Sequence, residues 1–234
     1  MSVPSPSPRV SAVVPVLQEE STIERVLDHL AAQPQVDEIV VVDGGSSDRT
    51  VELARRHPVG ARVLRSSPGR ARQQNAGARA ASGRIVLFIH ADTRLPPGGA
   101  AGLARVAGSA DVAGGNFAVR FDGPGLFPRA LGATYAVQRA LGVFYGDSAI
   151  FCRRRWFLER GGFPEIEIME DYELARAIVG TGASRRLPGP AITSSRRWRA
   201  AGIPRTVASW VVIRWLFIAG VSPARLARLY AIIR

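Results

Sequence analysis

The first ninety residues alternate four times between a strand pattern and a helix pattern, and this alternation constrains the fold more than any other feature of the chain. The expected strands are short, apolar and rich in β-branched residues, and they cover 10–14, 38–42, 61–64 and 85–89. Strands that are apolar on both faces are typical of a parallel sheet with helices on both sides. The sequence therefore predicts an α/β protein with a mostly parallel central sheet flanked by helices.

Helices are expected between these strands, over about 22–30, 48–57 and 70–81. In the first of them, Ile23, Val26, Leu27 and Leu30 recur at helical spacing. Ser21 and Glu24 have the spacing of a capping box, which predicts that Ser21 caps the first helix. The second half is less regular. We expect strands there at 112–121, 149–152 and 190–194, and helices at 128–141, 169–179, 204–219 and 222–231.

The composition of the 234 residues is that of a globular protein, with 47% hydrophobic and 21% charged residues, which excludes wholesale disorder. A single cysteine, Cys152, excludes an internal disulfide and a cysteine-rich zinc site, and it suits a reducing compartment. Residues 1–8 are rich in serine and proline and have no apolar segment typical of a signal peptide. We therefore expect a flexible tail over 1–8 and a cytoplasmic location.

Positive charge is concentrated at the C-terminus. The chain has a net charge of +12 and no lysine, and residues 174–234 contain 11 arginines and no acidic residue, which favours an anionic partner. The apolar stretch 207–221 is interrupted by Arg214 and is too short to span a bilayer. We expect a main domain over 9–200 and a helical appendage over 201–234. Three alternatives stay open for its segment 204–234: contact with the inner face of the plasma membrane, packing on the main domain, or a homodimer contact. Its apolar content disfavours nucleic acid.

Polar residues follow three of the expected strands: Gln18 and Glu19, then Asp43, then His90 and Asp92. Ligands of parallel α/β sheets bind beyond the carboxyl ends of the strands, so these side chains predict a nucleotide-type site at one edge. The first strand is not followed by G-x-G-x-x-G, which excludes hydride transfer with a dinucleotide. A Walker A loop is excluded because the chain has no lysine.

Several segments, taken in order, resemble one known family. They are VVPVLQEE at 13–20, VVDGGSSDRT at 41–50, HADT at 90–93, GGFP at 161–164 and MED at 169–171. They resemble family 2 glycosyltransferases with a Rossmann-like GT-A fold, and in particular the short bacterial subgroup called transferase 2, rSAM/selenodomain-associated. The resemblance covers nearly the whole chain. It implies transfer of a sugar from a nucleotide-diphosphate donor, of UDP or GDP type, to an acceptor that the sequence does not identify; a lipid would suit a membrane-facing C-terminus.

The resemblance also implies a donor site at the strand ends. Glu19 is expected to accept a ribose hydroxyl, and Asp43 an N–H group of the base. A turn that precedes the next helix is the alternative explanation of the segment from Asp43 to Ser46. The expected donor contacts are Pro15, Val16, Leu17, Glu19, Asp43, Gly45, Arg70, Ala91 and Asp92.

Metal and catalytic residues are implied in the same way. Asp92 stands at the family's Asp-x-Asp position and is the expected ligand of Mg²⁺ or Mn²⁺. His90 replaces the first aspartate, is a second candidate ligand, and shifts the preference toward Mn²⁺. Asp171 matches the base that takes the proton of the acceptor, and direct attack implies inversion at the anomeric carbon. The residues expected at the acceptor or the diphosphate are Gly146, Asp147, Glu170, Arg197 and Trp198.

Two other functions stay open. A catalytically silent nucleotide-sugar-binding protein is suggested by His90 and by Ser194, which stands where the family's Gln-x-x-Arg-Trp motif has glutamine. The incomplete motif also disfavours processive polymerisation. A nucleotidyltransferase shares this half-sheet, but residues 16–20 do not resemble a triphosphate-binding loop.

Overall fold

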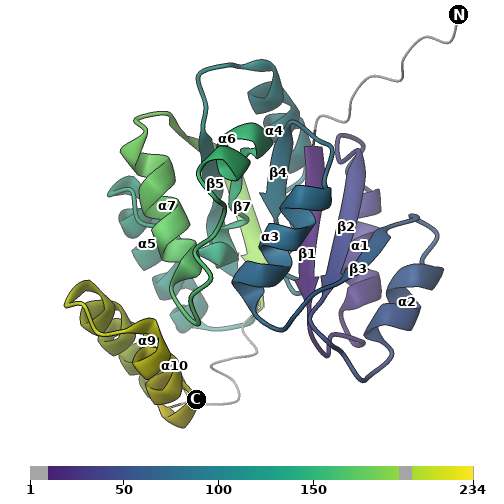
Figure 1. Ribbon diagram of the computed structural model, residues 1–234. Coiled ribbons are helices and arrows are strands. Elements are labelled where there is room, and N and C mark those ends of the chain that lie inside the picture. The colour runs from purple at the N-terminus through teal and green to yellow at the C-terminus, as the bar shows by residue number, and fades with distance from the viewer. Residues whose placement is uncertain (1–9, 195–201, 234) are drawn as a thin grey trace, which may run out of the picture.

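The computed structural model describes residues 10–194 and 202–233. The N-terminal half contains β1 (Val10–Val16), α1 (Ile23–Ala31), β2 (Glu38–Asp43), α2 (Thr50–Arg56), β3 (Arg62–Arg65), α3 (Arg70–Ala80), β4 (Ile85–Phe88) and α4 (Gly99–Gly108). The C-terminal half contains β5 (Gly114–Phe121), α5 (Leu126–Ala140), the 3₁₀ turn Gly146–Ser148, β6 (Phe151–Arg153), α6 (Arg154–Glu159), α7 (Glu170–Gly180), β7 (Ser184–Thr193), α9 (Ile203–Ile218) and α10 (Pro223–Ile233). Figure 1 shows their arrangement.

The described part of the chain forms one seven-stranded sheet in the order β3-β2-β1-β4-β6-β5-β7. Neighbouring strands from β3 to β4 are parallel, β6 is antiparallel to both β4 and β5, and β7 pairs in parallel with β5. The predicted α/β class with a mostly parallel sheet is confirmed. The antiparallel direction of β6 was not predicted, since a strand of three residues carries no signal of direction.

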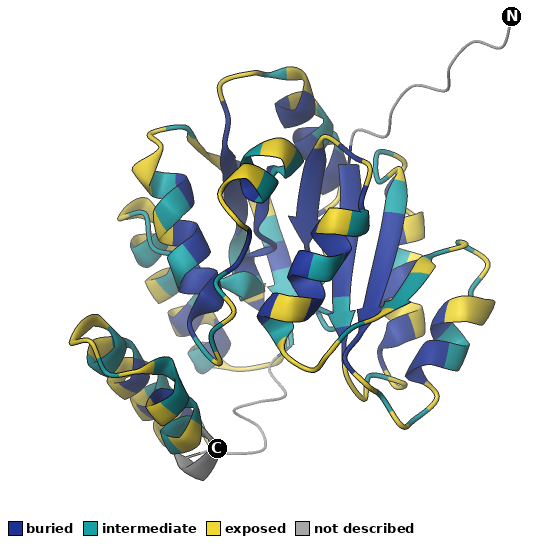
Figure 2. Ribbon diagram, in the orientation of Figure 1, coloured by how far each residue is buried: buried dark blue, intermediate teal, exposed yellow. Residues whose placement is uncertain are grey.

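Each face of the sheet has its own hydrophobic core, because successive residues of a strand point to opposite faces. On one face, Ala12 and Val14 of β1 belong to a buried cluster with apolar residues of α1, α2 and α4. On the other face, Val13 belongs to a cluster with residues of α3, α6 and α7. Figure 2 shows the strands buried between helices that are buried along one side only. The all-apolar strands are therefore explained by burial on both faces.

The C-terminal helices α9 and α10 lie against each other beside the ends of α5 and α7 (Figure 1). Ile213 of α9 and Leu226 of α10 are buried in a cluster with Met169 and Tyr172 at the start of α7. Tyr172 also meets Phe217 edge-on, with ring centroids 6.0 Å apart. No described helix is long and apolar enough to cross a membrane. The helix pair therefore packs on the main domain around the start of α7.

Three local predictions differ from the structure. The capping box is wrong: α1 begins at Ile23 after Thr22, without a side-chain cap, and the Thr22 hydroxyl bonds to Glu19 instead. The last strand of the sheet starts at Ser184, earlier than the predicted 190, because it pairs along the whole of β5. Helices α4 and α6 were not predicted. The sequence of α4, GAAGLARVAG, is mostly glycine and alanine, and α6 has only six residues.

Candidate functional site

The carboxyl ends of β1, β2, β4, β5 and β7 meet at one edge of the sheet, because these strands all run in the same direction. The predicted polar groups that follow β1, β2 and β4 therefore share this edge. Since β6 is antiparallel, it starts at the same edge, which brings the turn Gly146–Ser148 there as well. Residues from both halves of the chain therefore lie at the same edge of the sheet.

The end of β1 and the loop after it carry four of the expected donor contacts. Leu17 is 49% exposed and Pro15 is partly exposed, whereas Val16 is buried. The Glu19 carboxylate accepts a hydrogen bond from the Thr22 hydroxyl. Gln18 has a left-handed backbone (φ 56°). Residues other than glycine rarely adopt this conformation, and those that do are often found at functional sites. Pro15, Leu17 and Glu19 therefore lie at the sheet edge and are at least partly exposed.

Asp43 is fully buried, and the turn predicted as the alternative explanation is present. Its Oδ1 accepts a hydrogen bond from the Ser46 N–H (3.0 Å) and its Oδ2 one from the Gly45 N–H (3.2 Å). Gly45 has a φ of +104°, which suits glycine. Both carboxylate oxygens therefore already bind the backbone of the turn. An additional bond to a nucleotide base would use their remaining lone pairs.

Gln73, on α3, is a positioning residue that the sequence did not reveal. Its buried Nε2 donates to the Val16 carbonyl (2.8 Å) and to the Val42 carbonyl (2.9 Å). An added Cβ at Gly44 would lie 2.9 Å from the Gln73 side chain, so the glycine allows this amide to approach. Gln73 thus ties the ends of β1 and β2 together. Its type and spacing match a solvated helix face, so no sequence signal distinguished it.

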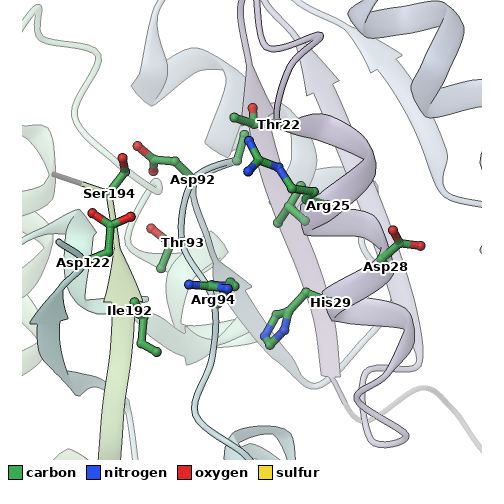
Figure 3. A pocket seen from close by; sticks show the side chains of 12 residues that line it. Thr22, Arg25, Asp28, His29, Asp92, Thr93, Arg94, Asp122, Ile192 and Ser194 are labelled. Carbon is green, nitrogen blue, oxygen red and sulfur yellow. The ribbon is translucent and has the colours of Figure 1, made fainter. Parts of the chain in front are cut away.

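Asp92 follows β4 and lines a polar cavity of about 580 Å³ together with Ala91. Figure 3 shows the Asp92 carboxylate beside Ser194 and Asp122, across the cavity from Thr22 and Arg25. His29, on the far side, accepts a hydrogen bond from the Leu95 N–H at Nε2. Burial, with a contribution from Arg94, lowers the pKa of His29, which keeps that nitrogen free of a proton. Asp92 is thus the expected ligand that faces the cavity at the sheet edge.

His90 faces a different group. Its Nδ1 lies 3.9 Å from Oδ1 of Asp147, and its ring is close enough to Gly146 that an added Cβ there would lie 3.0 Å from Cε1. The structure therefore brings His90 together with Gly146 and Asp147, and His90 is not among the residues that line the cavity of Asp92.

Arg70 and Glu170 form an ion pair between the start of α3 and the start of α7. Burial alone lowers the pKa of Arg70, but the carboxylates of Glu170, Asp171 and Asp147 outweigh it and raise that pKa. Burial raises the pKa of Glu170, opposed by Arg70 and supported by Asp171. One Glu170 oxygen, Oε2, is buried and has no hydrogen-bond partner among the described residues. The pair fixes the Arg70 guanidinium next to Asp171.

Asp171 is 8% exposed, and its Oδ2 accepts a hydrogen bond from the Gly146 N–H at 2.9 Å. The residue before this acidic pair, Met169, has a left-handed backbone (φ 71°). An added Cβ at Gly146 would lie 3.2 Å from Asp171 Oδ2, so a glycine is needed for the two chain segments to approach. The Asp171 carboxylate is therefore held in one orientation, with lone pairs left for a proton.

A second cavity, of about 780 Å³, opens beside Asp171. At one end its lining is polar and includes Arg70, Asp147 and Asp171. The rest is mainly apolar and comes from α5, the segment before α7, and the C-terminal helices. These residues are Leu131, Ile168, Met169, Val207, Trp210, Val211, Ile213, Ala227 and Tyr230. Predicted catalytic and acceptor residues thus share a cavity with the C-terminal helices.

The residues present fit a divalent cation that takes part of its coordination from a ligand. Among the described residues no group of three or more His, Cys, Asp or Glu side chains could hold a metal alone. Asp92 offers carboxylate oxygens to a cavity wide enough for a diphosphate. Oxygen ligands of this kind suit Mg²⁺ and Mn²⁺.

Arg197 and Trp198 lie outside the described residues, as does the predicted tail 1–8.

Comparison with known proteins identifies the family. The profile described as glycosyl transferase family 2 matches residues 11–167. Undecaprenyl-phosphate 4-deoxy-4-formamido-L-arabinose transferase of Yersinia pestis bv. Antiqua (strain Angola) is 32% identical over 174 residues, which cover 68% of this chain and 53% of that enzyme. The chain thus spans about half the length of this curated relative.

Solved structures agree with the fold. The chain is similar to S. aureus TarS 1–349 in complex with UDP-GlcNAc, with a TM-score of 0.65, 18% identity, and coverage of 80% of this chain and 58% of that one. It is also similar to glucosyl-3-phosphoglycerate synthase from Mycobacterium tuberculosis in complex with Mn²⁺, UDP-glucose and phosphoglyceric acid. That match has a TM-score of 0.57, 26% identity, and coverage of 79% and 71%. With the profile match over two thirds of its length, the chain belongs to glycosyl transferase family 2, and it has the GT-A fold.

Proposed function

We propose that this protein is a glycosyltransferase that moves a sugar from a nucleotide-diphosphate donor to a lipid acceptor, with inversion at the anomeric carbon. The observation that carries the proposal is the second cavity, in which Asp171 and Arg70 share one lining with the apolar residues of α9 and α10. A carboxylate at the end of an apolar cavity suits an acceptor with a reactive head and an apolar chain. Two relatives support the reaction class: the Yersinia enzyme is named for undecaprenyl phosphate, and the mycobacterial synthase was solved with UDP-glucose and Mn²⁺.

Asp171, Arg70 and Asp92 each have a separate role in the proposed reaction. Asp171, held by the Gly146 N–H, takes the proton of the attacking acceptor oxygen. Arg70, fixed by Glu170, offers its guanidinium to the leaving diphosphate. Asp92, with His90 as a second candidate, would hold Mn²⁺ or Mg²⁺ together with diphosphate oxygens. When bound, the cation supplies neutralising charge to the leaving group.

We also propose a subgroup and domain boundaries for this chain. We place the chain in the short bacterial subgroup called transferase 2, rSAM/selenodomain-associated, because its motifs occur in that order over nearly the whole chain. Residues 9–200 form the catalytic domain, preceded by a tail at 1–8. Residues 201–234 form an appendage with two roles: one side closes the acceptor cavity, and the other contacts the membrane.

Donor binding is tested by thermal unfolding with UDP and GDP, each in the presence of Mn²⁺, Mg²⁺ or a chelator. At ~100 Kd a bound nucleotide adds roughly 2.7 kcal/mol, which is visible as a rise in melting temperature. We expect a rise that requires the cation and that disappears in Asp92→Ala. The matched control is Asp28→Ala, which removes a carboxylate from the far side of the same cavity. If no nucleotide stabilises the wild type with either cation, the donor site is refuted.

The membrane contact rests on the outer side of α9. Val212, Trp215 and Ile218 are large apolar side chains that are 42–64% exposed, and none of them lines the acceptor cavity. Arg225 and Arg228 of α10 are also exposed. An apolar surface beside arginines suits a bilayer with anionic lipid.

We expect the chain to sediment with vesicles that contain phosphatidylglycerol, and less so at high salt. Removing the Trp215 ring by Trp215→Ser should weaken binding about tenfold, the effect of losing ~1.5 kcal/mol of apolar burial. Leu126→Ser is the control, because Leu126 is 80% exposed and belongs to α5 rather than to the appendage. A wild type that ignores the vesicles and is dimeric by light scattering would assign this side to a second copy instead.

A further inference from the structure

One side of α9 faces the acceptor cavity and carries a single charged residue. Val207, Trp210, Val211 and Arg214 all line the cavity. Their spacing of three, four and seven residues from Val207 places them on one face of the helix. A guanidinium in this otherwise apolar row needs a partner of its own.

Two buried polar atoms that line the cavity have no hydrogen-bond partner among the described residues. The Nε of Arg214 is buried and has no hydrogen-bond partner, and the same is true of Oε1 of Gln138, on α5. Both residues line the cavity. Buried polar atoms without partners are rare in folded proteins, and a bound molecule is one way to satisfy them. The two atoms together call for a ligand with an acidic oxygen and a hydroxyl or acid proton.

Three other charged residues that line this cavity have partners within the chain. Asp147 accepts a hydrogen bond from the Tyr135 hydroxyl (3.3 Å), Asp171 binds the Gly146 N–H, and Arg70 is paired with Glu170. The Arg214 side chain also forms a hydrogen bond with Tyr145, whose pKa burial raises to about 12 although Arg214 lowers it. Tyr145 therefore keeps its proton at neutral pH, and this bond leaves Nε of Arg214 without a partner among the described residues.

We propose that Arg214 makes this cavity selective for lipids that carry a phosphate group. Its guanidinium donates to a phosphate oxygen, a pairing that its geometry and permanent charge favour. Gln138 binds a hydroxyl or acid proton of the same headgroup, and the apolar chain lies against Leu131, Val207 and Trp210. The inference rests on the proposed function, since it takes the cavity to be the acceptor site. It adds the chemical class of the acceptor and identifies Arg214 as the residue that recognises the phosphate.

The test measures calorimetric binding of three probes to the full chain: farnesyl phosphate, the neutral alcohol farnesol, and inorganic phosphate. A hydrogen bond to a charged group predicts that farnesyl phosphate binds about tenfold or more tightly than farnesol. Arg214→Gln should remove this preference and leave farnesol binding unchanged. Arg55→Gln, the same charge change at an exposed position of α2, should keep it. Arg214→Lys should retain part of it through its charge.

Equal binding of farnesyl phosphate and farnesol, binding of neither, or an equal loss in Arg214→Gln and Arg55→Gln would overturn the inference. Inorganic phosphate that binds as tightly as farnesyl phosphate would overturn the lipid part of it. Melting temperatures of the variants show whether they fold. The stabilisation by UDP or GDP with a cation is measured on the same proteins. If that stabilisation persists while the phosphate preference is absent, the inference fails and the proposed donor site stands.

Discussion

Asp171→Asn is expected to reduce sugar transfer to a hydroxyl acceptor about 10²–10⁴-fold, the usual contribution of a positioned general base. The substitution keeps the shape of the side chain and the contact with Gly146, but it removes the carboxylate that takes the proton. The measurement is kcat with saturating donor and acceptor. Stabilisation by nucleotide and cation should be unchanged, because Asp171 has no part in the proposed donor contacts.

Glu173→Gln is the matched control for Asp171→Asn, since it removes a carboxylate from the same first turn of α7. Glu173 pairs with Arg176 on the helix surface. Its variant should keep kcat within about twofold, because an exposed pair of this kind contributes little to stability. If Asp171→Asn transfers sugar as fast as the wild type, Asp171 is not the base.

The size of the loss in Asp171→Asn also identifies the attacking oxygen. A lipid phosphate has a second pKa of about 6 and is mostly ionised at neutral pH, so it needs a base less than a hydroxyl does. A much smaller loss with a lipid phosphate than with a hydroxyl lipid would show that the phosphate oxygen is the nucleophile. Equal losses would show that the phosphate serves only for recognition.

Gly115→Ala is expected to destabilise the fold by about 3 kcal/mol or more, at the upper end of the range for overpacking. Gly115 lies in β5 between β6 and β7. An added Cβ would stand 1.7 Å from the Arg185 carbonyl oxygen, which is backbone and cannot rotate away. Urea unfolding measures the difference. The variant should also lose nucleotide stabilisation, because β7 leads to Ser194 in the cavity of Asp92.

Gly108→Ala at the end of α4 is the control and should have the opposite sign. An added Cβ there meets nothing within 4 Å, and its backbone is not left-handed. Alanine at such a site restricts the unfolded chain and stabilises by roughly 0.4–1 kcal/mol. A Gly115→Ala variant as stable as the wild type would contradict the close packing of β5 and β7.

Local patterns were enough to predict the sheet and most helices, because burial on both faces leaves a continuous apolar run in each strand. They were not enough for β6, whose three residues pair antiparallel to β4 and so bring Gly146 and Asp147 to the sheet edge. They also failed at Ser21, where the Thr22 hydroxyl pairs with Glu19 rather than with the helix. Hydrogen bonds between loops decide such details.

The candidate site, too, was predicted in part by sequence motifs and decided in part by tertiary contacts. Motifs predicted which residues gather at the edge, but Asp43 binds its own turn, and His90 lies toward Asp147 rather than into the cavity of Asp92. Gln73 and Gln138 carry no sequence signal, since a buried glutamine looks like an exposed one. The role of each depends on neighbours that are distant in the sequence or belong to another helix.

The amino-acid sequence alone determined the α/β class, the shared edge of β1, β2 and β4, and the family resemblance, because these depend on short-range patterns and on the order of motifs. Only the tertiary structure decided that residues of α9 and α10, including Arg214, line the cavity beside Asp171. An apolar helix with one arginine is, by its sequence, equally consistent with a membrane surface, a dimer contact or packing on the domain. The packing of α9 against Met169 and Tyr172 settles which side faces the protein, because burying those apolar surfaces together lowers the free energy of the fold.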